Sequence, residues 1–530
     1  MIPPKPQARP DKTNFWQHLR LFRQDILSSQ PARLYRAWMA EFRTPFFRSY
    51  LCNDPALVAR ILSERPEDFP KSNRIREGLS PLLGNSVFVT NGEVWKRQRR
   101  IIDPAFEGGR LRDTFPAMVA AGAASAGRMS PGVTEIEEDM SHAAADVIFR
   151  TLFSIPIEHE IASAVFREFR TYQRTQPLLN LAAFLPLPGW MPRFHKPATR
   201  RSAAVIRGLI ARLCQARADE IAAGTAPDDL ATKIMTTRDP MSGETFTTEE
   251  MIDQVAIFFL AGHETSASAL SWALYLLALY PQVQDRVAAE AVSLGQAPYF
   301  SELSKLKYTR DVFREVLRLY PPVPMMVREN RCPETMRDLN VAPGAQMVLS
   351  PWHLHRHERI WPNPDAFDPD RWQTEENRAC ARDAYLPFST GTTGLHGGRV
   401  CHGGRAASFG NAGPGLAVCA YRRARSGAGG ASDGAGEGWD LVGPVATLAR
   451  LKHQEFSKTL ANFFEEICFQ TTMEMASRLQ KITNCPAFST ARNPRRRTSK
   501  QKRWRPTKRS TSSTDRRSIP PSAAARALNN

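Results

Sequence analysis

The chain has 530 residues, of which 42% are hydrophobic and 23% are charged. This balance is typical of a globular protein, and the length accommodates one large domain or several smaller ones. The net charge of +18 would suit a nucleic-acid-binding protein, but thirteen Lys or Arg and a single acid, Asp515, lie between residues 492 and 530. That segment accounts for twelve of the eighteen charges and leaves six for residues 1–491. The main part of the chain therefore gives no reason to expect nucleic acid as a partner.

Cysteine usage and apolar segments bear on the compartment. The eight cysteines are scattered without a CxxC pair, which is typical of a reducing cytoplasm rather than of a disulfide scaffold. The first twenty residues lack the apolar stretch of a signal peptide. Residues 255–280 are long enough to span a bilayer, but His263, Glu264 and Thr265 lie near the middle, where an ionised group is costly. We therefore expect a buried core helix, no membrane span and a cytoplasmic location.

Helical periodicity dominates the chain up to residue 390. In chain order, the pattern predicts helices at 54–69, at 92–106 as far as Pro104, in two or three pieces over 117–172, and at 200–224, 249–280, 281–294 and 308–320. "TTEE" at 247–250 is a helix N-terminal signal. The apolar, Pro-rich residues 177–194 form a connector, either a pocket lid or a packed loop. Residues 340–350 have the period and punctuation of a β-hairpin. The expected class is mainly α with small β-sheets (α+β).

The composition changes abruptly at Gly391. Residues 391–443 hold 16 of the 31 glycines, and glycine costs about 1 kcal/mol per helical position. This segment is therefore not expected to form a stable helix or a core strand. Beyond residue 490 the chain is basic and rich in Ser, Thr and Pro, which favours disorder. We divide the chain into a folded domain at 1–391, a Gly/Ala/Arg-rich segment at 392–450 and a basic tail at 451–530.

The motif AGHETS, residues 261–266, places polar groups midway along the apolar helix. Glu264 and Thr265 could relay protons from water to an oxidant bound against the helix. Ala261 and Gly262 have almost no side chain, so they would let a flat ligand approach the backbone. The alternative is a polar notch that is satisfied by a neighbouring helix. The motif alone does not decide between the two.

Two further patterns place charged residues at fixed spacing. Glu315 and Arg318 are three residues apart, hence on one face of a helix. They form either an ordinary surface pair or, with Arg371 of "HRHERIWPNPDAFDPDRW", a network. Trp95 and Arg99 are four residues apart in a third segment, "GEVWKRQRR".

These motifs, in this order and spacing, resemble the cytochrome P-450 family of haem-thiolate monooxygenases over residues 1–391. The resemblance implies a helical fold around haem b held by a cysteine thiolate, and insertion of one oxygen atom from O₂ into a small lipophilic substrate. It also implies a separate ferredoxin or flavoprotein as electron donor. The site residues that it implies are Trp95, Arg99 and Arg328 at the haem propionates, Ala261 and Gly262 beside the haem, Glu264 and Thr265 in oxygen activation, and Glu315, Arg318 and Arg371 in a structural network.

The haem loop of this family follows Phe-x-x-Gly-x-Arg-x-Cys-x-Gly. Phe388 and Gly391 match its first half, which places the ligand cysteine at position 395, where this chain has Leu395. The second half, Gly397-x-Arg399-x-Cys401-x-Gly403, comes six residues later. A six-residue insertion would make Cys401 the iron ligand and Arg399 a haem-binding residue. The other explanation is a slipped reading frame.

The frame slip can be tested on the letters themselves. Synonymous codons for "TTGLHGGRVCHGGRA" (392–406), read one base out of step, permit PRVCTGGGFAMVEG directly after "PFSTG". This restores the whole loop with a cysteine at position 395, and an apolar helix follows it. Cys401 then matches the motif by chance. Ligation by one of the histidines nearby would not support thiolate-type chemistry. We therefore expect this chain to have little or no oxygenase activity. If the insertion is genuine, the alternative is a non-catalytic haem- or ligand-binding pseudoenzyme.

Overall fold

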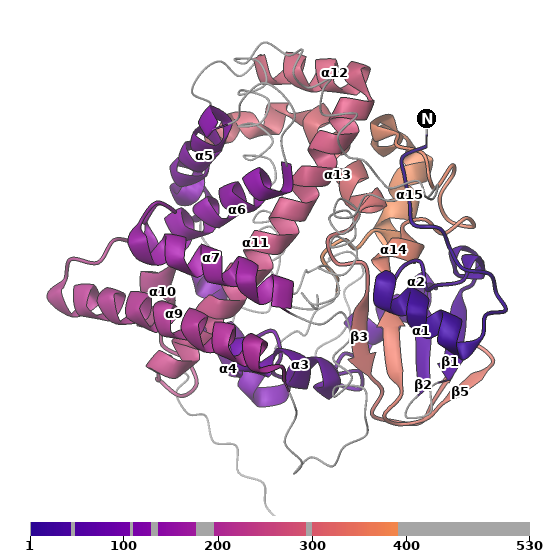
Figure 1. Cartoon of the computed structure of the whole chain (residues 1–530), viewed down its shortest axis with the longest axis horizontal. Coiled ribbons are helices and arrows are strands. Elements are labelled where there is room, and N and C mark those ends of the chain that lie inside the picture. The colour runs from indigo at the N-terminus through magenta and orange to yellow at the C-terminus, as the bar shows by residue number, and fades with distance from the viewer. Residues whose placement is uncertain are drawn as a thin grey trace, which may run out of the picture. The chain divides into compact units, whose positions relative to one another are not determined.

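A single long helix, α11 (Thr248–Leu279), organises the fold. The computed structural model describes residues 2–43, 48–106, 110–128, 136–175, 195–292 and 299–390, all within one compact unit. Helices α6 (Ile136–Phe153), α9 (Pro197–Ala223), α3 (Asn73–Leu83) and α13 (Lys307–Leu319) pack against α11 (Figure 1). Most side chains of α11 are buried, so the prediction of a core helix is confirmed.

The start of α11 shows why the sequence folds there. The Thr247 side chain accepts a hydrogen bond from the Glu250 backbone, and the Glu250 side chain accepts one from the Thr247 backbone, which forms a capping box. The "TTEE" signal is thus confirmed. Within the described residue ranges, the structure contains no helix that is long and apolar enough to cross a membrane.

The remaining helices follow the predicted order. Residues 54–69 form a short helix and a wide turn rather than one helix, and residues 92–106 end in a 3₁₀ turn at Asp103–Phe106. The further helices are α1 (Phe15–Gln24), α2 (Pro55–Ala59), α4 (Gly92–Ile102), α5 (Arg110–Arg128), α7 (Glu160–Thr175), α10 (Leu230–Thr236), α12 (Pro281–Val292), α14 (Pro351–Leu354) and α15 (Glu375–Ala384). Single turns lie at η1 (Ala32–Tyr35), η2 (Arg60–Glu64), η4 (Phe300–Lys305) and η5 (Pro369–Gln373).

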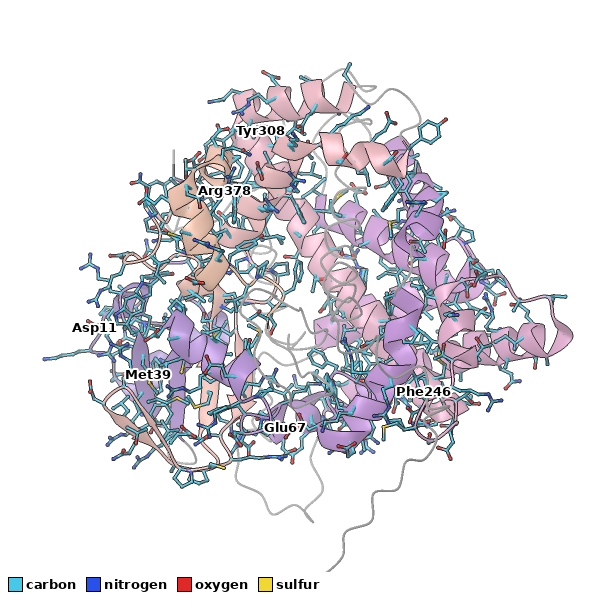
Figure 2. All side chains as sticks on the ribbon, turned by 180° about the vertical axis from the view of Figure 1, so that it is seen from behind. Asp11, Met39, Glu67, Phe246, Tyr308 and Arg378 are labelled. Carbon is cyan, nitrogen blue, oxygen red and sulfur yellow. The ribbon has the colours of Figure 1, made fainter. Side chains whose placement is uncertain are left out.

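Two small sheets complete the fold. The larger has the strand order β1 (Met39–Arg43), β2 (Arg48–Cys52), β6 (Gln346–Leu349) and β3 (Met326–Glu329), with β2 and β6 parallel. The smaller pairs β4 (Glu334–Met336) with β5 (Leu339–Val341). Figure 2 shows Met39 of the larger sheet and Phe246, which precedes α11, on opposite sides of the picture. The expected class, mainly α with small β-sheets, is confirmed.

The predicted hairpin at residues 340–350 is wrong. Its two extended pieces, β5 and β6, belong to different sheets and do not pair with each other. The backbone at Asn330 lies between them, since its N–H donates to the Ala345 carbonyl and its carbonyl accepts from the Gly344 N–H. The strand β6 pairs instead with β2 and β3, and β5 pairs with β4, so tertiary packing outweighs the local pattern here.

Candidate functional site

Four side chains from separate parts of the chain meet to form what we call the cationic cluster: Lys71, Trp95, Arg99 and Arg328. Lys71, just before α3, faces Arg328 of β3 in an isolated antiparallel backbone bridge. The Lys71 ammonium lies 5.4 Å from the ring centre of Trp95, and the Arg99 guanidinium carbon lies 5.7 Å from the same ring. Trp95 and Arg99 are four residues apart on α4, so both point to one side of that helix.

The charges in this cluster are not balanced. Arg99 Nε donates to Asp103 Oδ1 at 2.8 Å, whereas, among the residues that the structure describes, neither Lys71 nor Arg328 forms an ion pair. The Lys71 ammonium donates instead to the Val87 carbonyl at 2.7 Å. Burial lowers the pKa of Arg328 to about 10. Burial, and then the charges of Arg328 and Arg99, lower the pKa of Lys71 well below its usual range.

Three donors of the cluster have no acceptor in the described part of the chain. They are Trp95 Nε1, Arg99 Nη1 and Arg328 Nε, and each residue is less than a tenth exposed. A buried donor that is left without a partner costs about 1–3 kcal/mol. The cluster therefore offers unpaired donors and uncompensated positive charge, which would suit an anionic ligand.

The AGHETS motif turns two of its residues toward α6. His263 is buried and its Nε2 lies 2.7 Å from Ser141 Oγ; burial, and then the charge of Arg170, lower its pKa to about 4. A Cβ atom added to Gly262 would lie 2.9 Å from Ile148 Cδ1. The space beside Gly262 is therefore filled by α6. This packing contact is one reason for a glycine at this position, and the approach of a flat ligand stays a prediction.

The carboxyl and hydroxyl groups of the motif are adjacent and partly buried. Glu264 accepts a hydrogen bond from the Gln173 side chain of α7. Thr265 Oγ1 donates to the carbonyl of Ala261 at 2.6 Å. The contact with Gln173 is what a polar notch satisfied by a neighbouring helix would show, and the proton-relay role of Glu264 and Thr265 stays a prediction.

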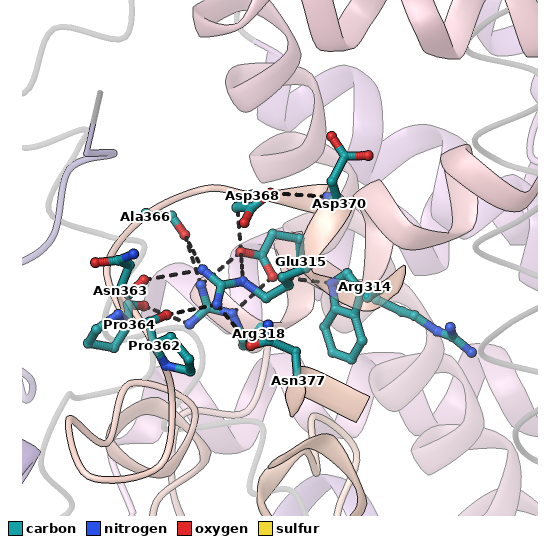
Figure 3. A network of polar contacts seen from close by, with 12 residues as sticks. Arg314, Glu315, Arg318, Pro362, Asn363, Pro364, Ala366, Asp368, Asp370 and Asn377 are labelled. Atoms are coloured by element: carbon teal, nitrogen blue, oxygen red, sulfur yellow. Dashed lines mark hydrogen bonds and ion pairs between the residues drawn. The ribbon is translucent and has the colours of Figure 1, made fainter. Parts of the chain in front are cut away.

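Glu315, Arg318 and Arg371 form one buried network (Figure 3). Arg318 donates to both oxygens of Glu315 at 2.9 and 2.8 Å, and Arg371 donates to Glu315 Oε1 at 2.9 Å. None of the three side chains is more than 2% exposed. Burial alone would raise the pKa of Glu315, but the charges of Arg318 and Arg371 outweigh it, and the pKa is lowered.

The same network holds the segment that follows α14. Arg318 also donates to the backbone carbonyls of His355, Pro364 and Ala366, and Arg371 donates to those of Pro362 and Asn363. Figure 3 shows Pro362, Asn363, Pro364 and Ala366 of this segment beside the guanidinium groups. The network therefore fixes the path of residues 355–371 around α13.

Some expected residues cannot be placed. Arg399, Cys401 and Leu395 lie outside the described residues, as do the connector 177–194 and the segments 392–450 and 451–530. In the ranges that are described, Cys52 and Cys214 are buried, and burial raises their thiol pKa to about 12, so neither is poised as a thiolate. Those ranges also hold no cluster of three His, Cys, Asp or Glu residues that could bind a metal ion.

Sequence reasoning missed Lys71. No local motif marks this residue, and its place in the cluster follows from its backbone bridge to Arg328, a residue far away in the sequence. The local sequence, "DFPKSN", gives no usable signal for it.

Comparison with known proteins identifies the class. The family model described as "Cytochrome P450" matches residues 19–408. The chain is 32% identical over 375 residues to a cyclooctat-9-en-7-ol 5-monooxygenase of Streptomyces melanosporofaciens, covering 69% of this chain and 79% of that protein. It is 29% identical to a pentalenene oxygenase of Streptomyces avermitilis, covering 65% of this chain and 76% of the relative.

The fold agrees with these sequence matches. The haem domain of cytochrome P450DA superposes with a TM-score of 0.62 over 87% of this chain and 90% of that chain, at 21% identity. The chain belongs to the cytochrome P450 family. It is therefore by family an oxidoreductase of the monooxygenase class, and the cofactor of this family is thiolate-ligated haem b.

The residues of the cationic cluster fit this cofactor. Haem b carries two propionate groups, and within the described residues the cluster offers two cations without counter-ions, the buried Arg328 and the partly exposed Lys71, together with three unpaired donors. Charge-assisted hydrogen bonds from such donors to carboxylates are stronger than neutral ones.

Proposed function

We propose that this chain derives from a haem-dependent monooxygenase that inserts one oxygen atom from O₂ into a small lipophilic substrate. The observation that carries the proposal is the cationic cluster. Lys71, Trp95, Arg99 and Arg328 would hold the propionates. In that role their unpaired donors gain acceptors, and the cost of burying them without partners is removed.

The charges of the cluster support this assignment. Asp103 already balances Arg99, which leaves the positive charges of Lys71 and Arg328. Two propionates supply two negative charges, so the filled site would be neutral. A buried charge is tolerated when it is paired and strongly destabilising when it is not.

Bound haem supplies the oxygen chemistry, which the protein does not perform itself. The protein would position the substrate and deliver protons. Thr265 Oγ1 donates a hydrogen bond to the Ala261 carbonyl, and the lone pairs of its oxygen can still accept one. Glu264, one residue earlier, is a titratable group that can take up and release a proton. Together they form the proposed proton relay on α11.

The substrate class and the electron donor belong to the same proposal. The two Streptomyces relatives carry names that give an alkenol and an alkene as the compounds acted on, which supports a small lipophilic substrate for this chain. A separate ferredoxin or flavoprotein would provide the electrons in the cytoplasm.

We further propose that the unaltered chain has little or no oxygenase activity, because Leu395 occupies the position of the ligand cysteine. The same observation favours a second candidate function, a non-catalytic haem-binding pseudoenzyme, if the six extra residues are genuine. Resequencing the gene through the codon for Gly391 separates the two. If one base of the known sequence proves to be spurious, the frame slip is supported. If every base is really present in the gene, the pseudoenzyme is supported.

Activity is tested on two chains, the unaltered chain and one with the restored loop after Gly391. Both are loaded with haem, supplied with a ferredoxin and its reductase, and offered a panel of cyclic alkenes and alkenols under ¹⁸O₂. We expect ¹⁸O in the products of the restored chain alone. A haem-loaded restored chain that oxidises none of these compounds would overturn the proposed substrate class, and turnover by the unaltered chain would overturn the proposed inactivity.

A further inference from the structure

His355 joins two parts of the fold through its ring and its backbone. The residue follows α14 and is completely buried. Its Nδ1 lies 3.2 Å from the Arg318 carbonyl, and its Nε2 lies 2.9 Å from the backbone nitrogen of Leu386. In return, Arg318 Nη1 donates to the His355 carbonyl at 2.9 Å. The imidazole therefore stands between α13 and the segment that leads to Phe388.

The partners of the ring define its protonation. A backbone N–H can only donate, so Nε2 accepts from Leu386 and carries no proton. The proton of the neutral ring is then on Nδ1, from which it is donated to the Arg318 carbonyl. Burial, and then the charge of Arg318, lower the pKa of His355 to about 3, so the ring keeps this form at neutral pH.

The residues next to Leu386 are held by the same helix. The Tyr385 ring stacks on His355 with centroids 5.3 Å apart, and it meets Trp372 edge-on at 4.8 Å. The Tyr385 hydroxyl donates to the Arg314 carbonyl at 3.3 Å. Both residues that precede Pro387 are thus tied to α13 or to its network.

The backbone just beyond is held in an uncommon conformation. Ser389 has a φ of 69° and is 3% exposed, and its N–H donates to the Leu386 carbonyl at 3.2 Å. A non-glycine residue adopts this left-handed conformation only where its surroundings enforce it. The position of Leu386 is one such constraint.

We propose that His355 is a positioning residue for the haem loop. It transmits the position of the Glu315–Arg318 network to the backbone of Leu386 and so fixes where residues 387–391 begin. The inference rests on the proposed haem function for its purpose, but the contact itself is a property of the chain without cofactor. No ligand contact is required of His355.

Two amide substitutions in the full chain separate the two hydrogen bonds. In His355→Gln the side-chain amide oxygen reaches the position of Nε2 and can accept the hydrogen bond from the Leu386 N–H. In His355→Asn the shorter side chain reaches only the position of Nδ1. Hydrogen exchange, followed by mass spectrometry of fragments that contain residues 385–390, measures the protection of the Leu386 amide. We expect His355→Gln to retain this protection and His355→Asn to exchange about tenfold faster or more at this amide, since a buried donor loses its acceptor. Fragments from α11 should exchange alike in both.

A second readout is spectroscopic. The ¹⁵N signals of His355 in the unsubstituted chain should show a proton on Nδ1 and a bare Nε2 at neutral pH. A proton on Nε2, or equal exchange of Leu386 in both variants, would overturn the proposal. All of these measurements are made without haem, so a chain that binds no haem but shows the expected exchange would refute the proposed function and leave the positioning role intact.

Discussion

Lys71 and Arg328 lie opposite each other in an antiparallel backbone bridge, and no acid in the described part of the chain balances either of them. The two residues come from distant parts of the sequence, so only the fold brings their charges together. Without a ligand this arrangement is unfavourable, because the two cations lack counter-ions and Arg328 is also buried. A ligand with two carboxylate groups would supply the missing negative charges.

Arg328→Met should therefore change stability and haem affinity in opposite directions. Replacing an uncompensated buried charge by an apolar side chain is expected to raise the free energy of unfolding of the haem-free chain by about 1 kcal/mol. Haem affinity should fall about tenfold or more, because a charge-assisted bond to a propionate is lost. Urea unfolding and hemin titration measure the two effects. Arg318→Met is the matched control, because it leaves Glu315 with one cation fewer and should lower the free energy of unfolding. An equal loss of unfolding free energy in both variants would contradict the account.

The buried network should contribute far more to stability than an exposed ion pair of similar geometry. Arg371→Met removes one partner of the buried Glu315, and we expect it to cost about 3 kcal/mol. The control is Arg286→Met, which breaks a bidentate pair with Asp370 whose side chains are 52% and 57% exposed. This second loss should stay under about 1 kcal/mol. Urea unfolding of both variants gives the comparison, and similar losses would show that the network is not structural.

Gly262→Ala distinguishes packing from ligand approach. The new methyl group meets the end of the Ile148 side chain, so about 1 kcal/mol of strain should offset a helix-propensity gain of similar size. The double variant Gly262→Ala, Ile148→Val removes the contact and should be more stable than the two single effects predict. Double-mutant analysis of urea unfolding measures this coupling. A coupling near zero, together with a loss of haem affinity in Gly262→Ala alone, would restore the ligand interpretation.

Buried neutral histidines predict how stability depends on pH. His263, His353 and His355 are each at most 1% exposed, and burial, foremost, lowers their pKa to about 4, 3 and 3. In the unfolded chain a histidine binds a proton below about pH 6.5, so stability that is present above this pH is lost as the pH falls toward the folded values. We expect a loss of about 5 kcal/mol between about pH 6.5 and about pH 5.

Urea unfolding across this range measures the loss. His353→Gln should remove about a third of it. A stability that is flat over this range would mean that the three rings are not buried and neutral.

Local patterns in the sequence predicted the helices and the network, because both depend on neighbours along the chain. The long helix α11 follows from an uninterrupted apolar run with a capping signal before it, and Glu315 and Arg318 share a face through their spacing of three. Arg371 was harder to place, since it reaches Glu315 from a segment beyond α14. Its network with Glu315 and Arg318 was one of two alternatives that the sequence left open, and the resemblance to a family favoured it.

Features that depend on distant partners could not be predicted. The strand β6 pairs with β2 and β3 rather than with the adjacent β5, and Lys71 joins the cationic cluster through a bridge to Arg328. The sequence also does not show that the side chain of Ile148 of α6 lies beside Gly262, where the approach of a flat ligand stays a prediction. In each case the deciding neighbour is remote in the chain.

The most direct test of the account is the absorbance spectrum of the full chain, loaded with haem, reduced and exposed to CO, beside its Cys401→Ser variant. The account predicts that haem binds through the cationic cluster, that neither chain shows a thiolate-type Soret band, and that the two spectra coincide. A thiolate-type band that disappears in Cys401→Ser would contradict it. Cys401 would then be the iron ligand, and the six extra residues would be a genuine insertion in a working haem loop.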